Sequence, residues 1–219
     1  MLLLDVMRKQ KRLKFDDSGL TREDWSTLKR LDTPTKVQDF LNTLPFNHDT
    51  RATNQVSVEQ VLESRKAHCF EGALFSACAL WIQGQRPLLL DLVADEPDDD
   101  HVVALFQVRG KWGAVSKTNH PVLRYREPIY RDVRELAMSY FHEYYLSDGR
   151  KTLRKYSKPF DLSRFGTSWI KPSLNPRDLA EALDRSPHYE ILTPSQIRQL
   201  RRADRIERQA TDLVEWKKL

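Results

Sequence analysis

Apolar residues recur at three- and four-residue steps through residues 65–81, in the stretch RKAHCFEGALFSACALW. This spacing is typical of a helix with one buried face, and it places Cys69 in the first turn. Backbone N–H groups at a helix start have no partner and the helix dipole is positive there, so a thiol in this turn is shifted toward the nucleophilic thiolate. The alternative is that Cys69 fills space in the core, and the helix alone favours that interpretation.

Three apolar segments after this helix predict an antiparallel meander. Leu88–Ala94 has the pattern of a buried strand, and an acidic loop at residues 95–100 separates it from the apolar run His101–Val108. A turn at residues 109–111 then leads into a third predicted strand over residues 112–118. The chain therefore carries a cysteine on a helix, a histidine at the start of one strand and polar residues on the next.

This order resembles that of the transglutaminase-like superfamily, in a branch of bacterial type, which is related to the papain-type cysteine proteases. In that family the third strand carries a Trp, the triad Asp four residues later and a Thr close behind, and here Trp112, Ser116 and Thr118 occupy those places. The resemblance covers about residues 34–145. It implies an α+β fold with a papain-like or transglutaminase-like core, in which the cysteine-bearing helix packs on an antiparallel sheet, followed by a helical C-terminal extension.

The resemblance implies that Cys69 and His101 form a catalytic nucleophile–base pair. Ser116 stands where the family has an Asp, and a hydroxyl can orient the imidazole but carries no charge. Asn119 is a competing candidate for this orienting role through its amide. Gln38, on a helix predicted after Pro34, is a candidate oxyanion donor together with the Cys69 backbone N–H; the alternative for Gln38 is a solvent-facing side chain.

Residues close to the pair carry further predictions. His68 is predicted to be a poor base for Cys69, because adjacent helix residues point about 100° apart, and it is expected to be exposed at the rim. Gly72 either allows another element to approach the nucleophile or makes an ordinary helix–helix contact. The acidic loop lacks the glycine and the distal Glu of a calcium loop, so no metal site is predicted. Its carboxylates are instead expected to raise the pKa of His101 and to attract basic substrate groups.

The 219 residues are enough for one core with a small appendage. We expect an N-terminal extension over residues 1–32, the transglutaminase-like core over 33–146, and a wrapping segment with C-terminal helices over 147–219. The net charge of +5 is small against 36 basic and 31 acidic side chains, so a nucleic-acid partner is not indicated. A basic helix predicted from residue 194 to the end is an alternative docking site for a partner.

Only two cysteines are present, Cys69 and Cys78, and on one helix they are too far apart to bridge. No disulfide framework is expected, which favours a reducing, cytoplasmic compartment. The apolar run in the first fourteen residues is too short for a secretory signal or a membrane span. A terminal strand or helix is expected there.

The predicted function is thiol-dependent acyl transfer on a carboxamide or peptide bond of a protein or peptide substrate, through a thioester and with no metal or organic cofactor. The enzyme would be a cysteine hydrolase, such as an amidase or peptidase, or a transglutaminase-like acyltransferase. The alternative is a catalytically inactive binding module that recruits a protein or nucleic-acid partner. Ser116 in place of Asp favours the alternative, and the presence of both Cys69 and His101 opposes it.

Overall fold

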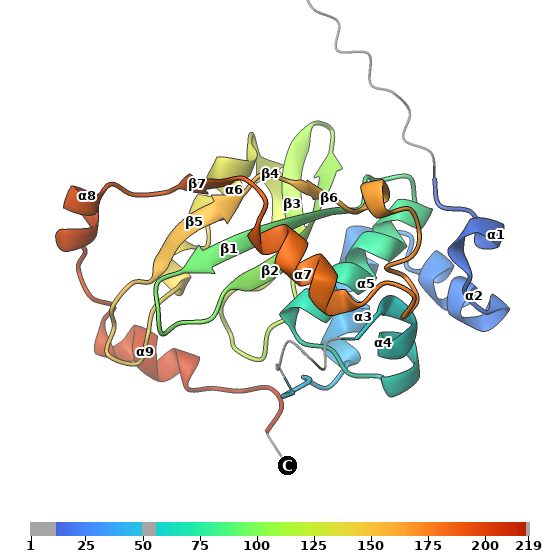
Figure 1. The fold of residues 1–219 in the computed structure, drawn as a ribbon. Helices are drawn as coiled ribbons and strands as arrows, with labels where there is room; N and C mark the ends of the chain where they lie inside the picture. The colour runs from blue at the N-terminus through green and yellow to red at the C-terminus, as the bar shows by residue number, and fades with distance from the viewer. Residues whose placement is uncertain (1–11, 50–55, 218–219) are drawn as a thin grey trace, which may run out of the picture.

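A computed structural model describes residues 12–49 and 56–217 of the chain (Figure 1). Its helices, with 3-10 helices labelled η, are α1 (Phe15–Ser18), α2 (Arg22–Arg30), α3 (Pro34–Thr43), α4 (Val58–Ser64), α5 (Cys69–Ile82), α6 (Val133–Met138), η2 (Phe141–Glu143), η3 (Leu162–Phe165), α7 (Pro176–Asp184), α8 (Pro194–Arg198) and α9 (Arg205–Thr211). Its strands are β1 (Leu88–Ala94), β2 (His101–Val108), β3 (Lys111–Val115), β4 (Arg126–Tyr130), β5 (Leu153–Ser157), β6 (Phe160–Asp161) and β7 (His188–Glu190).

The strands form one open antiparallel sheet in the order β4-β3-β2-β1-β5-β7, with β6 also paired to β1. The predicted meander is confirmed: β1 and β2 have the predicted bounds, and β3 begins at Lys111 and ends at Val115. Leu92 lies opposite His101 in the β1–β2 register, so the start of β2 is fixed beside the end of β1. The molecule is therefore an α+β fold, as predicted.

Both faces of the central strands are buried. Leu89 of β1 belongs to the core formed with α5, whereas Leu88, Leu90 and Leu92 belong to a second core on the other face, closed by α6 and η2. Side chains of a strand alternate between the two faces of a sheet, so a strand covered on both sides has apolar residues at nearly every position. This arrangement explains the continuous apolar run in β1.

Helix α5 is buried on all sides, which corrects the prediction of a helix with one buried face. Every residue from Phe70 to Ile82 is buried, and the helix packs against β1 and β2 on one side and against α2, α3 and α4 on the others (Figure 1). A helix that is apolar around its whole circumference is typical of the centre of a core. Its start, with Cys69, is consequently held on several sides.

The chain after residue 146 contributes to the central sheet as well as covering it. Strands β5 and β6 both pair with β1, and Leu179 and Leu183 of α7 belong to the same core as α5. The single basic helix predicted from residue 194 to the end is wrong, because α8 ends at Arg198 and α9 begins at Arg205. Asp204 starts α9 with its own capping box, which separates the two helices.

The expectation of a terminal strand or helix at the start of the chain concerns mostly residues 1–11, which lie outside the described residues. Within residues 12–49 and 56–217, no helix has the length and apolar character that crossing a bilayer requires.

Candidate active site

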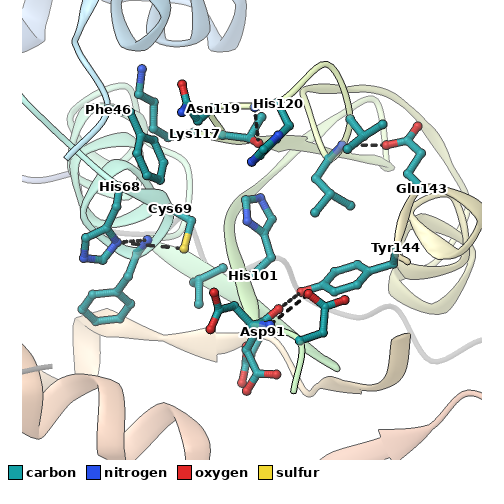
Figure 2. A pocket seen from close by; sticks show the side chains of 18 of the residues that line it. Phe46, His68, Cys69, Asp91, His101, Lys117, Asn119, His120, Glu143 and Tyr144 are labelled. Carbon is teal, nitrogen blue, oxygen red and sulfur yellow. Dashed lines mark hydrogen bonds between the residues drawn. The ribbon is translucent and has the colours of Figure 1, made fainter. Parts of the chain in front are cut away.

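The cysteine and the histidine line one cavity of about 720 Å³ (Figure 2). Cys69 is the first residue of α5 and His101 is the first residue of β2, and α5 packs against β2. The backbone N–H of Val102, the residue after His101, lies near the Cys69 sulfur and acts to lower the pKa of the thiol. No hydrogen bond joins the Cys69 thiol to the His101 ring in the described structure, so the two groups share a cavity without being bonded to each other.

The His101 ring is oriented by Ser116. His101 Nε2 lies 2.8 Å from Ser116 Oγ, and this hydroxyl donates to the carbonyl oxygen of Leu123 at 2.5 Å. A hydroxyl has one proton, so Ser116 Oγ must accept the His101 hydrogen bond, which assigns the imidazole proton to Nε2. Nδ1 is then the unprotonated nitrogen, available as a base.

Gln38 lies behind this pair, where its side chain holds the backbone of Ser116. Its amide oxygen accepts from the Ser116 N–H, and its amide nitrogen donates to the Ser116 carbonyl, both at 2.9 Å. The second amide proton goes to Asn42. Both donors are therefore engaged, and in this arrangement Gln38 positions Ser116 instead of offering a donor to the cavity. It is also buried, in contrast to the solvent-facing alternative.

Asn119 lines the cavity, but its amide is bonded to the C-terminal segment. Its Nδ2 donates to the Trp216 carbonyl at 2.9 Å, and its Oδ1 accepts from the Trp216 N–H at 2.8 Å. The Glu215 N–H donates to the Asn119 carbonyl as well. Asn119 makes no hydrogen bond to His101 within the described residues, so of the two candidate orienting groups the structure joins only Ser116 to the ring.

His68 is buried, which corrects the prediction that it lies exposed at the rim. Its side chain is 4% exposed, and it caps α5 by accepting from the Phe70 N–H at 3.2 Å through Nδ1. Glu71 completes a capping box by accepting from the His68 N–H, and it also accepts from the Val56 N–H and the Asn47 amide. Because the side chain folds back over the helix start, His68 Nδ1 lies 3.9 Å from the Cys69 sulfur.

Burial keeps both members of the pair neutral, which corrects the expectation that nearby carboxylates would raise the pKa of His101. Burial lowers the pKa of His101 from 6.5 to about 4, although the nearby Leu123 carbonyl acts in the other direction. Burial also raises the pKa of the Cys69 thiol from 9.0 to about 11, outweighing the backbone N–H groups of Val102 and Phe70. At neutral pH the free protein therefore holds a thiol and a neutral imidazole.

Gly72 permits the close approach that its position suggested, and the approaching residue is Lys117, just after β3. A Cβ atom on Gly72 would lie 2.6 Å from the Lys117 Cβ. Lys117 is 1% exposed, and its ammonium group donates to the carbonyls of Leu41 and Leu44 at the end of α3. The contact thus holds the segment that carries Ser116 against the start of α5.

Gly72→Ala is expected to destabilise the fold by about 1–3 kcal/mol, the usual range for overpacking a core. The new methyl group would meet a Cβ atom, which cannot rotate away. Chemical denaturation of the two proteins measures the difference. At an unobstructed helix position the same change stabilises a protein by up to about 1 kcal/mol, so a more stable variant would contradict the close contact.

Asp91 lines the cavity but is not among the residues predicted from the sequence, although the sequence contains a signal for it. Asp91 is the one charged residue in the apolar run of β1, and charged residues are seldom fully buried without a partner. Its side chain is 2% exposed and lines the cavity with Cys69. Lys117 gave no comparable signal, because its burial depends on contacts with α3 and α5 that are distant in sequence.

In the part of the chain that the structure describes, no three or more His, Cys, Asp or Glu side chains are grouped so as to hold a metal ion. Comparison with protein-family models and with curated proteins finds no match to this chain.

Proposed function

We propose that this chain catalyses thiol-dependent acyl transfer on a carboxamide or peptide bond, with Cys69 as nucleophile and His101 as general base, and that its core is transglutaminase-like. The observation that carries the proposal is the fixed tautomer of His101. Its Nε2 proton is bonded to Ser116 and its Nδ1 is unprotonated, in a cavity that also holds a thiol at the start of a helix. A cysteine with a neighbouring base that a third group orients is the arrangement used by cysteine nucleophiles.

Ser116 supports the proposal as an orienting group, although it has no charge. It fixes one tautomer, and it is itself held by Gln38 through both of its backbone polar groups. What Ser116 does not supply is a negative charge to stabilise the imidazolium. We infer that the ion pair forms only during the reaction, when substrate excludes water and the tetrahedral intermediate is generated.

The steps balance with these groups alone. His101 Nδ1 takes the thiol proton as the Cys69 sulfur bonds to the carbonyl carbon, and the carbonyl oxygen becomes an oxyanion. The Cys69 backbone N–H lies at the helix start and donates no hydrogen bond within the described residues, which makes it a candidate donor to the oxyanion. When the intermediate collapses, the C–N bond breaks and the amine leaves with the proton from Nδ1. Water or a second amine then gives a proton to Nδ1 as it attacks the thioester carbon, and when this second intermediate collapses the C–S bond breaks and the Cys69 sulfur takes the proton back from Nδ1.

The second candidate function is a binding module that keeps the fold without the chemistry. The observation that favours it is the neutral resting pair, since burial raises the pKa of Cys69 to about 11 and lowers that of His101 to about 4. A module of this kind would use the same cavity to hold a partner and would form no covalent intermediate.

Trapping of the acyl group distinguishes the two functions. The protein is incubated with hydroxylamine and a pool of peptides that carry glutamine, asparagine or C-terminal amides, and hydroxamates and Cys69 adducts are identified by mass spectrometry. We expect hydroxamate with the wild type and none with Cys69→Ala. With His101→Gln the rate of hydroxamate formation should fall by about 100-fold or more, as is usual for loss of a general base. Cys78→Ala, in the same helix but fully buried, is the matched control and should retain activity.

Failure to detect hydroxamate or adduct with any peptide in a correctly folded wild type would favour the binding module. Equal activity in Cys69→Ala and wild type would remove Cys69 as the nucleophile.

A further inference from the structure

Asp91 is a buried carboxylate whose two oxygens are in different situations. Its Oδ2 lies 3.2 Å from His188 Nε2, whereas its Oδ1 has no hydrogen-bond partner within the described residues. A buried carboxylate that is only partly paired is costly, and one imidazole on the opposite oxygen does not remove that cost. The unpaired oxygen points to a donor or a cation that the chain itself does not provide.

Asp91 belongs to the wall of the cavity that holds the nucleophile (Figure 2). Leu89 faces the core formed with α5, and Asp91 is two residues further along β1, so it lies on the same face of the sheet. It is opposite Val102 in the β1–β2 register, and both the Val102 N–H and the Asp91 charge act on the pKa of the Cys69 thiol. A group bound at Asp91 would therefore lie close to the thiol.

Two exposed carboxylates, Asp100 and Asp184, stand beside Asp91 on this wall. Both side chains reach solvent but are partly covered, and this partial burial with the neighbouring charges of Asp91 and Asp184 raises the pKa of Asp100 to about 6, while partial burial and Asp91 also raise the pKa of Asp184. Asp184 is the last residue of α7, where the helix dipole adds partial negative charge. The wall thus carries three carboxylates against one imidazole, that of His188.

The basic side chains on this part of the cavity have partners of their own. Lys155 pairs with Glu190 at 3.1 Å, and Arg177 pairs with Glu181 at 3.0 Å. An inorganic ion is disfavoured, because no group of three or more potential metal ligands is assembled in the described residues. An organic cation, which needs charge and hydrogen-bond acceptors but no fixed coordination shell, fits the wall better.

We propose that the wall formed by Asp91, Asp100 and Asp184 is a subsite for a guanidinium or alkylammonium group of the acyl-donor substrate. The cation lies against Asp91 between the two exposed carboxylates, and the rest of the substrate extends toward Cys69. That the bound group belongs to a substrate rests on the proposed acyl transfer. The ability of this wall to bind a cation does not depend on it. It gives the cavity a preference for peptides with arginine or lysine near the reacting carbonyl.

The test is a chemical-shift titration of the Cys69→Ala protein, in which no acyl transfer through this thiol can occur. The two probes are N-acetyl-arginine amide and N-acetyl-citrulline amide, which have similar shapes but differ in charge. We expect the arginine amide to bind at least 10-fold more tightly, with shifts at residues of this wall. Adding Asp91→Asn should weaken its binding about 10- to 100-fold, as expected for a lost charged hydrogen bond, whereas Asp16→Asn on α1 should have no effect.

Equal affinities for the two amides, or unchanged affinity in folded Asp91→Asn, would overturn the subsite. If Asp91→Asn does not fold, the variants Asp100→Asn and Asp184→Asn, at exposed positions, take its place. Unchanged affinity for the arginine amide in both of these variants would also overturn the subsite. Displacement of the arginine amide by micromolar Ca²⁺ or Mg²⁺ would reassign the wall to a metal.

These outcomes are independent of the proposed function. Binding of the arginine amide without any hydroxamate from arginine-containing peptides would remove the acyl transfer and leave the cation site. Equal hydroxamate formation from arginine- and citrulline-containing peptides, with no binding preference, would remove the subsite and leave the acyl transfer.

Discussion

Acidification from pH 6.5 to pH 4 is expected to lower the free energy of unfolding by several kcal/mol, because two histidines are buried in neutral form. Burial lowers the pKa of both His68 and His101 from 6.5 to about 4, and the two side chains are only 4% and 6% exposed. In the unfolded chain these groups take up protons below pH 6.5, whereas in the folded chain they do so only near pH 4. A difference of about 2.5 pH units corresponds to about 3 kcal/mol for each histidine.

The sign follows from which state binds more protons. Between pH 6.5 and pH 4 the unfolded state binds more protons than the folded state. The stability that the two neutral histidines contribute is therefore fully present above pH 6.5 and is lost as the pH falls toward 4. Glu71 acts in the opposite direction, because burial raises its pKa and its protonation favours the folded state. The histidine contribution is therefore measured as a difference between wild type and variants.

Denaturant unfolding from pH 8 to pH 4 checks this prediction with His101→Gln and His68→Asn. The asparagine can still cap α5 by accepting from the Phe70 N–H, which preserves the helix start. Each variant should lose about half of the acid sensitivity that the two histidines supply. His142→Asn is the control, because this histidine is exposed, and its pH profile should match that of the wild type. Full acid sensitivity in both core variants would rule out the two histidines as its source.

Local patterns predicted the elements around the site well. The apolar run Leu88–Ala94 and the run from His101 each specify an element through residues that are close in sequence, and β1 and β2 follow them. The order of these elements then brings Cys69 and His101 to one cavity. These elements could be predicted from the local sequence, without knowledge of contacts between distant segments.

The remaining features depend on such contacts. Strands β5 and β6 lie in a stretch dense in turn residues, and only pairing with β1 makes them part of the central sheet. His68 was expected to be exposed at the rim of the site. Its side chain instead folds back to cap α5 and is buried. The neutral state of His101 has the same origin, since the loss of solvent around a side chain is set by the whole core and outweighs charges that are visible in the sequence.

Cys69 is expected to react with iodoacetamide about 100-fold more slowly at pH 7 than a cysteine in an unstructured peptide. Alkylation requires thiolate, and burial raises the pKa of Cys69 from 9.0 to about 11, so the thiolate fraction falls by about two powers of ten. The rate should continue to rise with pH to about 11. Mass spectrometry after alkylation at a series of pH values measures it, and Cys69→Ser identifies the labelled site, since Cys78 is fully buried.

Variants of the neighbours separate a neutral pair from an ion pair that exists before substrate binds. His101→Gln should leave the alkylation rate at pH 7 within about twofold, because a neutral imidazole supplies no charge to the thiol. Asp91→Asn should increase the rate, because the Asp91 charge is among the causes that raise the pKa of Cys69. Rapid labelling at pH 7 that disappears in His101→Gln would contradict the neutral pair.

A thiol that reacts slowly in the free protein is compatible with the proposed chemistry only if bound substrate favours the transfer of the thiol proton from Cys69 to His101. A cation bound at Asp91 would neutralise one of the charges that disfavour the thiolate, and a polarised carbonyl would accept the sulfur as the proton moves to Nδ1 of His101. Activation would then depend on the substrate that carries the cation, and water or unrelated electrophiles would meet an unreactive thiol. The same burial that makes the two histidines sensitive to acid would in this way restrict the reactivity of Cys69 to its own substrate.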